Sequence, residues 1–462
     1  MPRTFHIRTF GCQMNEHDSQ RLAGLLVGEG MEQVDDVAAA DVVVLNTCCI
    51  RENADNKLYG ELGRLKALVD ARPGVQIAVG GCLAQKDGAA LRERAPHVDV
   101  VFGTHNLQRA PVLLRRAAAE GPVVEVPDAP PAVEEPASSL GAVRDVAHGA
   151  WVTIQVGCDN SCAFCIVPQV RGPEVSRPFD ELVAEVAALA ADGVSEVTLL
   201  GQNVNSYGRD LTRRRPLFAD LLRAVGAVPG IRRVRYTSPH PKDLRPETVA
   251  AMADTEAVCE HLHLPLQSGS DRVLAAMRRG YTAERYLAKL AAARAAVDDL
   301  AVTTDIIVGF PGETEDDFAD TLAVAAEAQY DSAYTFIFSP RPGTRAAVMT
   351  ERFVPDDVVA ERFERLRAVV ERSALAKHEA RVGRVEEVLV EGPSKRDPSM
   401  ITGRTRQNKL VHFRPDAAGG PPVGAYARVQ VERAAPHHLA GRLVEVLSVP
   451  PPRRTRLAVR AG

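Results

Sequence analysis

The sequence lacks an apolar run long enough to span a membrane, and its first residues contain no apolar stretch of signal-peptide length. A membrane-spanning helix needs roughly 20 consecutive apolar residues, and a secretory signal needs an apolar core near the start of the chain. We therefore expect a cytoplasmic protein with no membrane partner. No solenoid repeat is visible. At 462 residues the chain is too long for one hydrophobic core, so several domains are expected.

The sequence also lacks a strong excess of charge, since its net charge is −4, but the charge is unevenly distributed. Residues 381–449 carry eleven Lys or Arg against seven Asp or Glu, and the tail that follows adds four arginines. A basic module at the end of an otherwise acidic chain is typical of nucleic-acid binding, although a merely solvated surface has the same composition.

Eight cysteines stand out against this ordinary composition, and six of them fall into two groups of three. In a reducing compartment a disulfide framework is not expected, whereas grouped thiols hold metal or act as nucleophiles. Cys49 adjoins a member of one group but is expected to point elsewhere, and Cys259 is typical of a core residue without a partner.

The alternation of apolar runs predicts an α/β protein with three domains. Residues 1–118 alternate short β-branched runs with helical stretches, which predicts a parallel-sheet α/β domain. Residues 119–150 are rich in Pro, Ala and Glu, as linkers are. Residues 151–380 repeat the strand–helix alternation, which predicts a partial (β/α) barrel with function at the carboxyl ends of its strands. Residues 381–449 predict a small antiparallel β-barrel, and residues 450–462 form a basic tail.

The first cysteine group is Cys158, Cys162 and Cys165, in the segment GCDNSCAFCIVPQVRG directly after a predicted strand. Three thiolates suit three irons of a [4Fe–4S] cluster and leave the fourth iron open. Structural zinc is the alternative, but it would need a fourth Cys or His, and none lies at useful spacing. The spacing and the barrel-like alternation resemble the radical SAM superfamily, in which S-adenosylmethionine (SAM) chelates the open iron.

This resemblance implies where SAM contacts the chain. The aromatic residue before the third cysteine matches the one that the family places near the adenine. A loop after the second barrel strand matches the one that contacts the amino group of SAM, and glycine there allows close backbone approach. Other polar residues that end strands are expected at the same mouth. Together these candidates are Phe164, Gly201, Gln202, Asn203, Ser238 and Gln267.

The second cysteine group is Cys12, Cys48 and Cys82, which lie far apart in sequence but each close a predicted strand. If those strands are parallel, the three thiols emerge at one edge of the sheet, where ligands of open α/β sheets bind. Each cysteine alone could be a small buried hydrophobe. The shared position predicts a second iron–sulfur cluster.

Two cysteine triads in this order, followed by a small β-barrel, resemble the methylthiotransferases over residues 4–449. The segments that carry the resemblance are TFGCQMNEHDS, NTCCIRENA, GGCLAQ, LLGQNVNSYG, HLPLQSGSDRVLAAMRRGYT, DIIVGFPGET and SPRPGTRA. The last domain resembles a TRAM module, an RNA-binding barrel, through GRTRQNKLVHF. Pro173 and the stretch PQVRG depart from the usual family pattern, which puts substrate contacts around that loop in question.

Within the family, GQNVNSYG and NTCCIRENA are most similar to the MiaB type of tRNA methylthiotransferase. That resemblance implies two [4Fe–4S] clusters, SAM, and a tRNA substrate with an isopentenylated adenosine beside the anticodon. It implies that a SAM-derived radical abstracts the hydrogen at C2 of that adenine, which then takes a methylthio group. An electron donor such as a flavodoxin or ferredoxin is implied as well, and we expect a monomer.

The basic barrel is the expected grip on RNA phosphates. Five of its cations are the candidates: Lys395, Arg396, Arg404, Arg406 and Lys409. His412 and Phe413 could stack on a base, although at alternating strand positions one of the two belongs to the core. Three alternatives stay open: a methylthiotransferase for threonylcarbamoyl-adenosine in tRNA, one for an aspartate of a ribosomal protein, and a non-catalytic iron–sulfur sensor that binds RNA.

Overall fold

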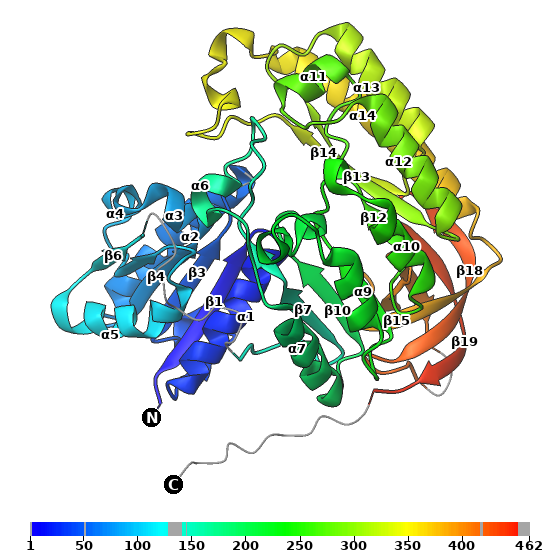
Figure 1. Ribbon diagram of the computed structural model, residues 1–462. Helices are drawn as coiled ribbons and strands as arrows, with labels where there is room; N and C mark the ends of the chain where they lie inside the picture. The colour runs from blue at the N-terminus through cyan, green and yellow to red at the C-terminus, as the bar shows by residue number, and fades with distance from the viewer. Residues whose placement is uncertain (1, 50–51, 128–140, 145, 416–418, 451–462) are drawn as a thin grey trace.

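The computed structural model describes residues 2–49, 52–127, 141–144, 146–415 and 419–450 (Figure 1). Its first part is a six-stranded parallel sheet, as predicted. The strand order is β2 (Glu32–Gln33), β1 (Thr4–Phe10), β3 (Val42–Thr47), β4 (Gln76–Gly81), β5 (Val100–Phe102) and β6 (Val123–Glu125). The sheet extends beyond residue 118, because β6 pairs with β5 as its last strand.

Helices cover both faces of this sheet. α1 (Gln13–Gly28) and α5 (Ala110–Glu120) pack on one face, and α2 (Glu52–Ala71) and α4 (Ala89–Arg94) on the other. The central strands β3 and β4 are buried along their whole length. Strands covered on both faces are apolar without alternation, which explains the run VVVL in β3.

The second part is a partial barrel of parallel strands wrapped by helices (Figure 1). Residues 257–259 hydrogen-bond to Val234 and lead directly into β12, so two three-stranded sheets follow one another around the barrel. The strands are β7 (Gly149–Thr153), β10 (Glu196–Leu200), β11 (Arg233–Tyr236), β12 (His261–His263), β13 (Ala301–Val308) and β14 (Ser332–Ile337). The outer helices are α7 (Phe179–Ala191), α9 (Phe218–Gly226), α10 (Pro246–Asp254), α12 (Ala283–Ala296), α13 (Glu315–Ala328) and α14 (Asp356–Glu379).

The third part is a closed five-stranded β-barrel in the order β15-β16-β17-β19-β18. Its strands are β15 (Val385–Pro393), β16 (Ile401–Thr405), β17 (Leu410–Arg414), β18 (Tyr426–Ala435) and β19 (His438–Ser448). The pairing is antiparallel as predicted, except that β17 and β19 run parallel. One parallel pair is unavoidable, because alternating directions cannot close a ring with an odd number of strands.

The small barrel packs against the amino ends of the partial-barrel strands. Arg233, fully buried at the start of β11, donates to the carbonyl of Arg404 at 2.8 Å. Tyr426 donates its hydroxyl to Ser195, next to the start of β10, at 3.1 Å. The carboxyl ends of the strands, where function is expected, therefore lie at the opposite edge.

Candidate functional site

The second triad lies at the carboxyl edge of the N-terminal sheet, where three neighbouring strands end in register. Phe10 of β1 pairs with Thr47 of β3, and Thr47 pairs with Gly81 of β4. The residues that follow these ends include Cys12, which caps α1, then Cys48, and then Cys82, which begins α3 (Cys82–Asp87). The register explains why residues so distant in sequence meet.

Two glycines let the chain approach this closely. A Cβ atom on Gly11 would stand 2.4 Å from the Cβ of Cys48, so a side chain there would displace the cysteine. Gly81 has φ +93°, and its added Cβ would lie 2.3 Å from the side-chain oxygen of Asn46. Glycine is the residue that accepts both demands.

The thiols of this edge form two contacting pairs. A hydrogen bond with Cys48, assisted by the charge of Arg171, lowers the pKa of Cys12 to about 6. The contact between Cys49 and Cys82 lowers the pKa of Cys82 to about 7 and raises that of Cys49. Lowered thiol pKa values favour the thiolates that bind iron. Cys49, expected to point elsewhere, lies within the same group of thiols.

The first triad lies in the loop between β8 (Gln155–Val156) and α6 (Val167–Arg171), just past the end of β7. Gly157 opens the loop with φ +85°, and a Cβ there would stand 1.8 Å from the carbonyl oxygen of Pro173. The amide of Cys158 donates to Gly172 at 3.1 Å, and that of Cys165 to Cys162 at 3.1 Å. These backbone bonds fix the loop without using its thiols.

Burial is the main influence on two thiols of the first triad. Burial raises the pKa of Cys158 to about 11 and that of Cys165 to about 12. The guanidinium of buried Arg279 donates to the sulfur of Cys162 at 3.4 Å. Thiols in such a setting ionise when a metal centre takes the place of their protons. Phe164 packs in the same loop against a small apolar cluster that contains Phe310 and Met277.

Helix α6 joins the two triads. Its neighbour Ile166 and its own Val170 are 2% exposed and belong to the core that also contains Cys49 and Cys82. Arg171, at the end of α6, is buried and pairs with Asp18 of α1 at 2.8 Å. The hydroxyl of Thr104 also donates to the carbonyl of Val170 at 2.5 Å. The loop that carries the first triad therefore continues directly into a helix that packs beside the second triad.

The predicted SAM residues gather at the carboxyl edge beside the first triad. Gln202 accepts from the amide of Gly157 at 2.6 Å, which ties the loop after β10 to the cysteine loop. Asn203 donates to Asp243 at 2.9 Å. Ser238 and Gln267 hold φ values of 58° and 69°, a strained conformation for residues other than glycine. Such strain clusters at functional sites.

Several buried polar atoms at this edge have no hydrogen-bond partner among the described residues. They are Gln155 Oε1, Asn203 Oδ1, His240 Nε2 and Gln267 Oε1. Buried polar atoms are almost always paired in folded proteins, so this group fits a polar ligand. His240 Nδ1 already accepts from the amide of Lys242, so its Nε2 is a donor. The three amide oxygens need donors from the ligand. The amino and hydroxyl groups of SAM have that chemistry. Within the described chain, no three His, Cys, Asp or Glu side chains converge on one ion. Ligands of a cubane cluster each bind a separate iron.

Comparison with known proteins agrees with this geometry. Models of three families match in succession: the uncharacterized protein family UPF0004 at residues 4–103, the radical SAM superfamily at 152–325, and the TRAM domain at 379–444. A tRNA-2-methylthio-N(6)-dimethylallyladenosine synthase from Acidothermus cellulolyticus is 54% identical, covering 98% of this chain and 90% of the relative. One from Mycobacterium marinum is 52% identical, covering 95% and 85%.

The chain belongs to the tRNA-2-methylthio-N(6)-dimethylallyladenosine synthase family. It is a radical SAM methylthiotransferase, as the sequence predicted.

Two solved radical SAM enzymes share the fold of this chain. The radical SAM methyltransferase TsrM from Kitasatospora setae, solved with cobalamin and a [4Fe–4S] cluster, matches with a TM-score of 0.54 at 15% identity. That match covers 75% of this chain and 77% of TsrM. The cobalamin-dependent SAM radical enzyme OxsB matches with a TM-score of 0.51 at 12% identity, covering 79% and 56%. In the synthase chain, no described helix is both long and apolar enough to cross a membrane.

The cations predicted to bind RNA in this synthase chain fall into two groups. Arg406 donates to both carboxylate oxygens of Glu260, at 2.7 and 2.8 Å, and Lys409 pairs with buried Asp331 at 2.7 Å. These pairs attach the TRAM barrel to the amino ends of the radical SAM strands. Arg404 is half-exposed and pairs with Glu391 at 2.9 Å.

The other predicted RNA contacts lie on the outer surface of the TRAM barrel. Lys395 and Arg396 are exposed in the loop between β15 and β16. Phe413 is fully buried and therefore belongs to the core, whereas His412 is partly exposed and contacts Thr402 at 2.9 Å.

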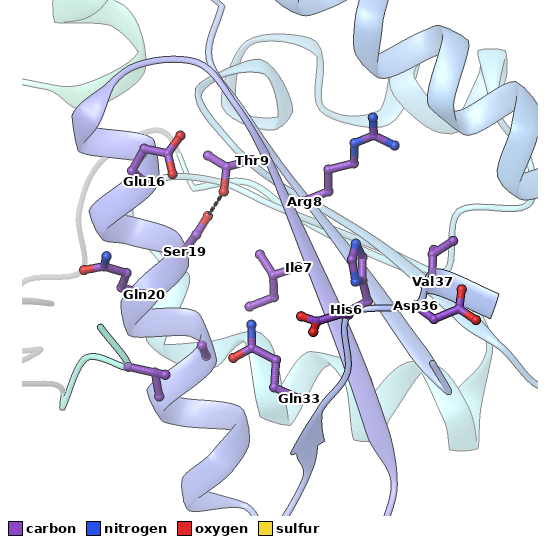
Figure 2. Close-up of a pocket in the computed structure, with 13 residues that line it drawn as sticks. His6, Ile7, Arg8, Thr9, Glu16, Ser19, Gln20, Gln33, Asp36 and Val37 are labelled. Carbon is purple, nitrogen blue, oxygen red and sulfur yellow. Dashed lines mark hydrogen bonds between the residues drawn. The ribbon is translucent and has the colours of Figure 1, made fainter. Parts of the chain in front are cut away.

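A cavity of about 600 Å³ lies between β1 and α1, lined by Arg8, Glu16 and Gln20 among others (Figure 2). Thr9 donates to Ser19 across it at 2.7 Å. No cysteine lines this cavity, so it is distinct from both triads.

Sequence reasoning missed Arg171, Asp18 and Arg279. Each is an ordinary charged residue in a helix or loop, and only the folded chain brings it to the thiols. The only hint in the sequence was the unusual segment PQVRG, which contains Arg171. That segment does not indicate that Arg171 pairs with Asp18.

Proposed function

We propose that this chain transfers a methylthio group to C2 of the isopentenylated adenosine beside the tRNA anticodon, using two [4Fe–4S] clusters and SAM. The observation that carries the proposal is the adjacency of two cysteine triads joined by α6. A radical initiator alone needs one triad. A second triad beside it supports a sulfur-bearing centre within reach of the same substrate carbon.

Each part of the chain has a defined task in this proposal. Cys158, Cys162 and Cys165 would hold the cluster that binds SAM, and Cys12, Cys48 and Cys82 the second cluster. When bound, these groups supply the radical and the sulfur. The protein positions the adenine between them and excludes water, so that the reactive species meets only the target carbon.

The SAM contacts rest on the polar residues of the mouth. Unpaired amide oxygens of Asn203 and Gln267 would accept from the amino or hydroxyl groups of SAM. Gly201 would lie beside SAM in the loop after β10, which packs closely on Gln155: a Cβ on Gly201 would stand 2.9 Å from that side chain. Gln202 and Ser238 would line the same mouth, and Phe164 would lie near the adenine. A one-electron donor such as a flavodoxin or ferredoxin would reduce the first cluster.

Exposed cations of the TRAM barrel would contribute to tRNA binding. Lys395 and Arg396 are free to meet phosphates, whereas Arg406 and Lys409 would act by fixing the orientation of the barrel. Arg404, half-exposed and paired with Glu391 of the same barrel, would add to the phosphate contacts.

The test is the nucleoside profile of tRNA from a strain that lacks this gene. We expect 2-methylthio-N6-isopentenyladenosine to disappear and its precursor without the methylthio group to accumulate. A plasmid copy of the wild-type gene should restore the product, and a copy with Cys158→Ala should not. An unchanged profile in the deletion strain would contradict the proposal and favour the ribosomal-protein alternative.

A further inference from the structure

A second cavity of about 600 Å³ opens beside the first cysteine triad. Asp159 and Asn160, from the cysteine loop itself, form one wall. Lys242, which follows β11, forms another, and its amine donates to the side chain of Asn160. Glu174 and four residues of the segment after β10 complete the lining: Arg209, Asp210, Arg213 and Arg214. The cavity therefore lies at the carboxyl edge of the partial barrel, at its mouth beside the cysteine loop.

Four cations and three carboxylates line this cavity, and its exposed residues include three of the cations together with Asp159 and Asp210. Arg213 and Arg214 are exposed, line the cavity, and have no side-chain partner among the described residues. Lys242 is exposed as well. Arg209 also lines the wall but is paired with Asp243 at 2.7 Å. Three cationic side chains thus stand at the mouth without a carboxylate partner.

The carboxylates of the same cavity are engaged within the protein. Asp159 accepts from the amide of Glu174 at 3.0 Å, and Asp210 accepts from the amide of Ser176 at 2.8 Å. Glu174 is half-buried, and its burial raises the pKa of its carboxyl group. The wall therefore offers three exposed cations without a carboxylate partner, whereas its exposed carboxylates, Asp159 and Asp210, each accept a backbone hydrogen bond.

The two arginines also occupy a strained backbone. Arg213 has φ 58° and Arg214 has φ 130°, both in the region that residues other than glycine rarely adopt. Such conformations persist where the surrounding structure enforces them, commonly at ligand-binding segments. Here the strain accompanies a placement of two consecutive arginines in the wall of one cavity.

We propose that Arg213, Arg214 and Lys242 bind backbone phosphates of the substrate RNA next to the modified nucleotide. The assignment rests on the proposed function. A base that enters the mouth draws its flanking phosphates across the rim of the barrel, where these cations lie. Arginine matches phosphate geometry with paired donors. The TRAM cations Arg406 and Lys409 are occupied at the opposite edge, so they do not supply this contact.

The test measures tRNA binding as a function of salt for the reconstituted full chain. In R213A/R214A the slope of log affinity against log salt should fall in magnitude by roughly two, since each lost phosphate contact removes about one unit. Affinity should fall roughly 10- to 30-fold at about 0.15 M salt. R213K/R214K keeps both charges and should keep the slope.

The matched control is K66A/R372A, which removes two exposed cations from α2 and α14 that have no described partner. It should bind like the wild type, and iron content should be equal in all variants. A slope in R213A/R214A that equals the control would overturn this assignment alone. Absence of RNA binding by the wild type would instead overturn the proposed function.

Discussion

At the scale of single residues, the charge on Arg171 is the feature that distinguishes the second triad. Its guanidinium is buried, pairs with Asp18, and lowers the pKa of both Cys12 and Cys82. A buried cation beside thiolates offsets part of their mutual repulsion. It would do the same for the negative charge of a thiolate-bound cluster.

Replacement of Arg171 by Gln leaves the carboxylate of Asp18 buried without its cation. We expect the free energy of unfolding to fall by about 3–5 kcal/mol, because an unpaired buried charge is costly. In anaerobic chemical denaturation, the double variant R171Q/D18N should recover part of that loss. The potential of the second cluster should become more negative. Equal stability of R171Q and wild type would contradict the structural role assigned to this pair.

The residues that sequence could identify are those whose chemistry has a rigid spacing. Cys158, Cys162 and Cys165 are close in sequence, so their spacing alone predicts a shared site. The pairing of Cys49 with Cys82 depends on side-chain directions at the edge of the sheet. A side chain can turn either way at the end of a strand, and the sequence carries no signal that decides between them.

At the scale of elements, two cations that were predicted to bind RNA instead attach the TRAM barrel to the radical SAM domain. Arg406 pairs with Glu260, and Lys409 pairs with Asp331. A basic strand looks the same in sequence whether its cations face phosphate or a carboxylate of the neighbouring domain. Lys409 and Asp331 are both nearly fully buried at this interface, with side-chain exposures of 3% and 8%. The alternation in GRTRQNKLVHF predicted the strands correctly, but it could not indicate what covers them.

Substitution of Lys409 by Ala should therefore destabilise the chain, because Asp331 would remain buried without a partner. We expect a loss of about 3–5 kcal/mol in the free energy of unfolding. Lys395→Ala, at an exposed site of the same barrel, should change stability by no more than about 0.5 kcal/mol. Urea denaturation of both variants makes the comparison. Equal effects would show that Lys409 is not an interface residue.

At the scale of the whole molecule, the first cysteine triad and the TRAM barrel lie at opposite ends of the partial-barrel strands. The triads and the residues predicted to bind SAM lie at the carboxyl ends of parallel strands, and the TRAM barrel packs at the amino ends of the partial-barrel strands. The parallel sheet and partial barrel followed from strand–helix alternation, which local physics enforces. The contact between the two halves through α6 could not be predicted, because it depends on the packing of Ile166 and Val170 against a distant core.

The central claim, that the two triads hold separate clusters, is tested most directly by iron and sulfide analysis of anaerobically reconstituted protein. We predict roughly eight irons per chain in the wild type, two cubane clusters' worth. Roughly four should remain in each triple variant, C12A/C48A/C82A and C158A/C162A/C165A. Cys259→Ala, a buried cysteine outside both triads, should retain roughly eight. Roughly four irons in the wild type, or none in either triple variant, would contradict the two-cluster account.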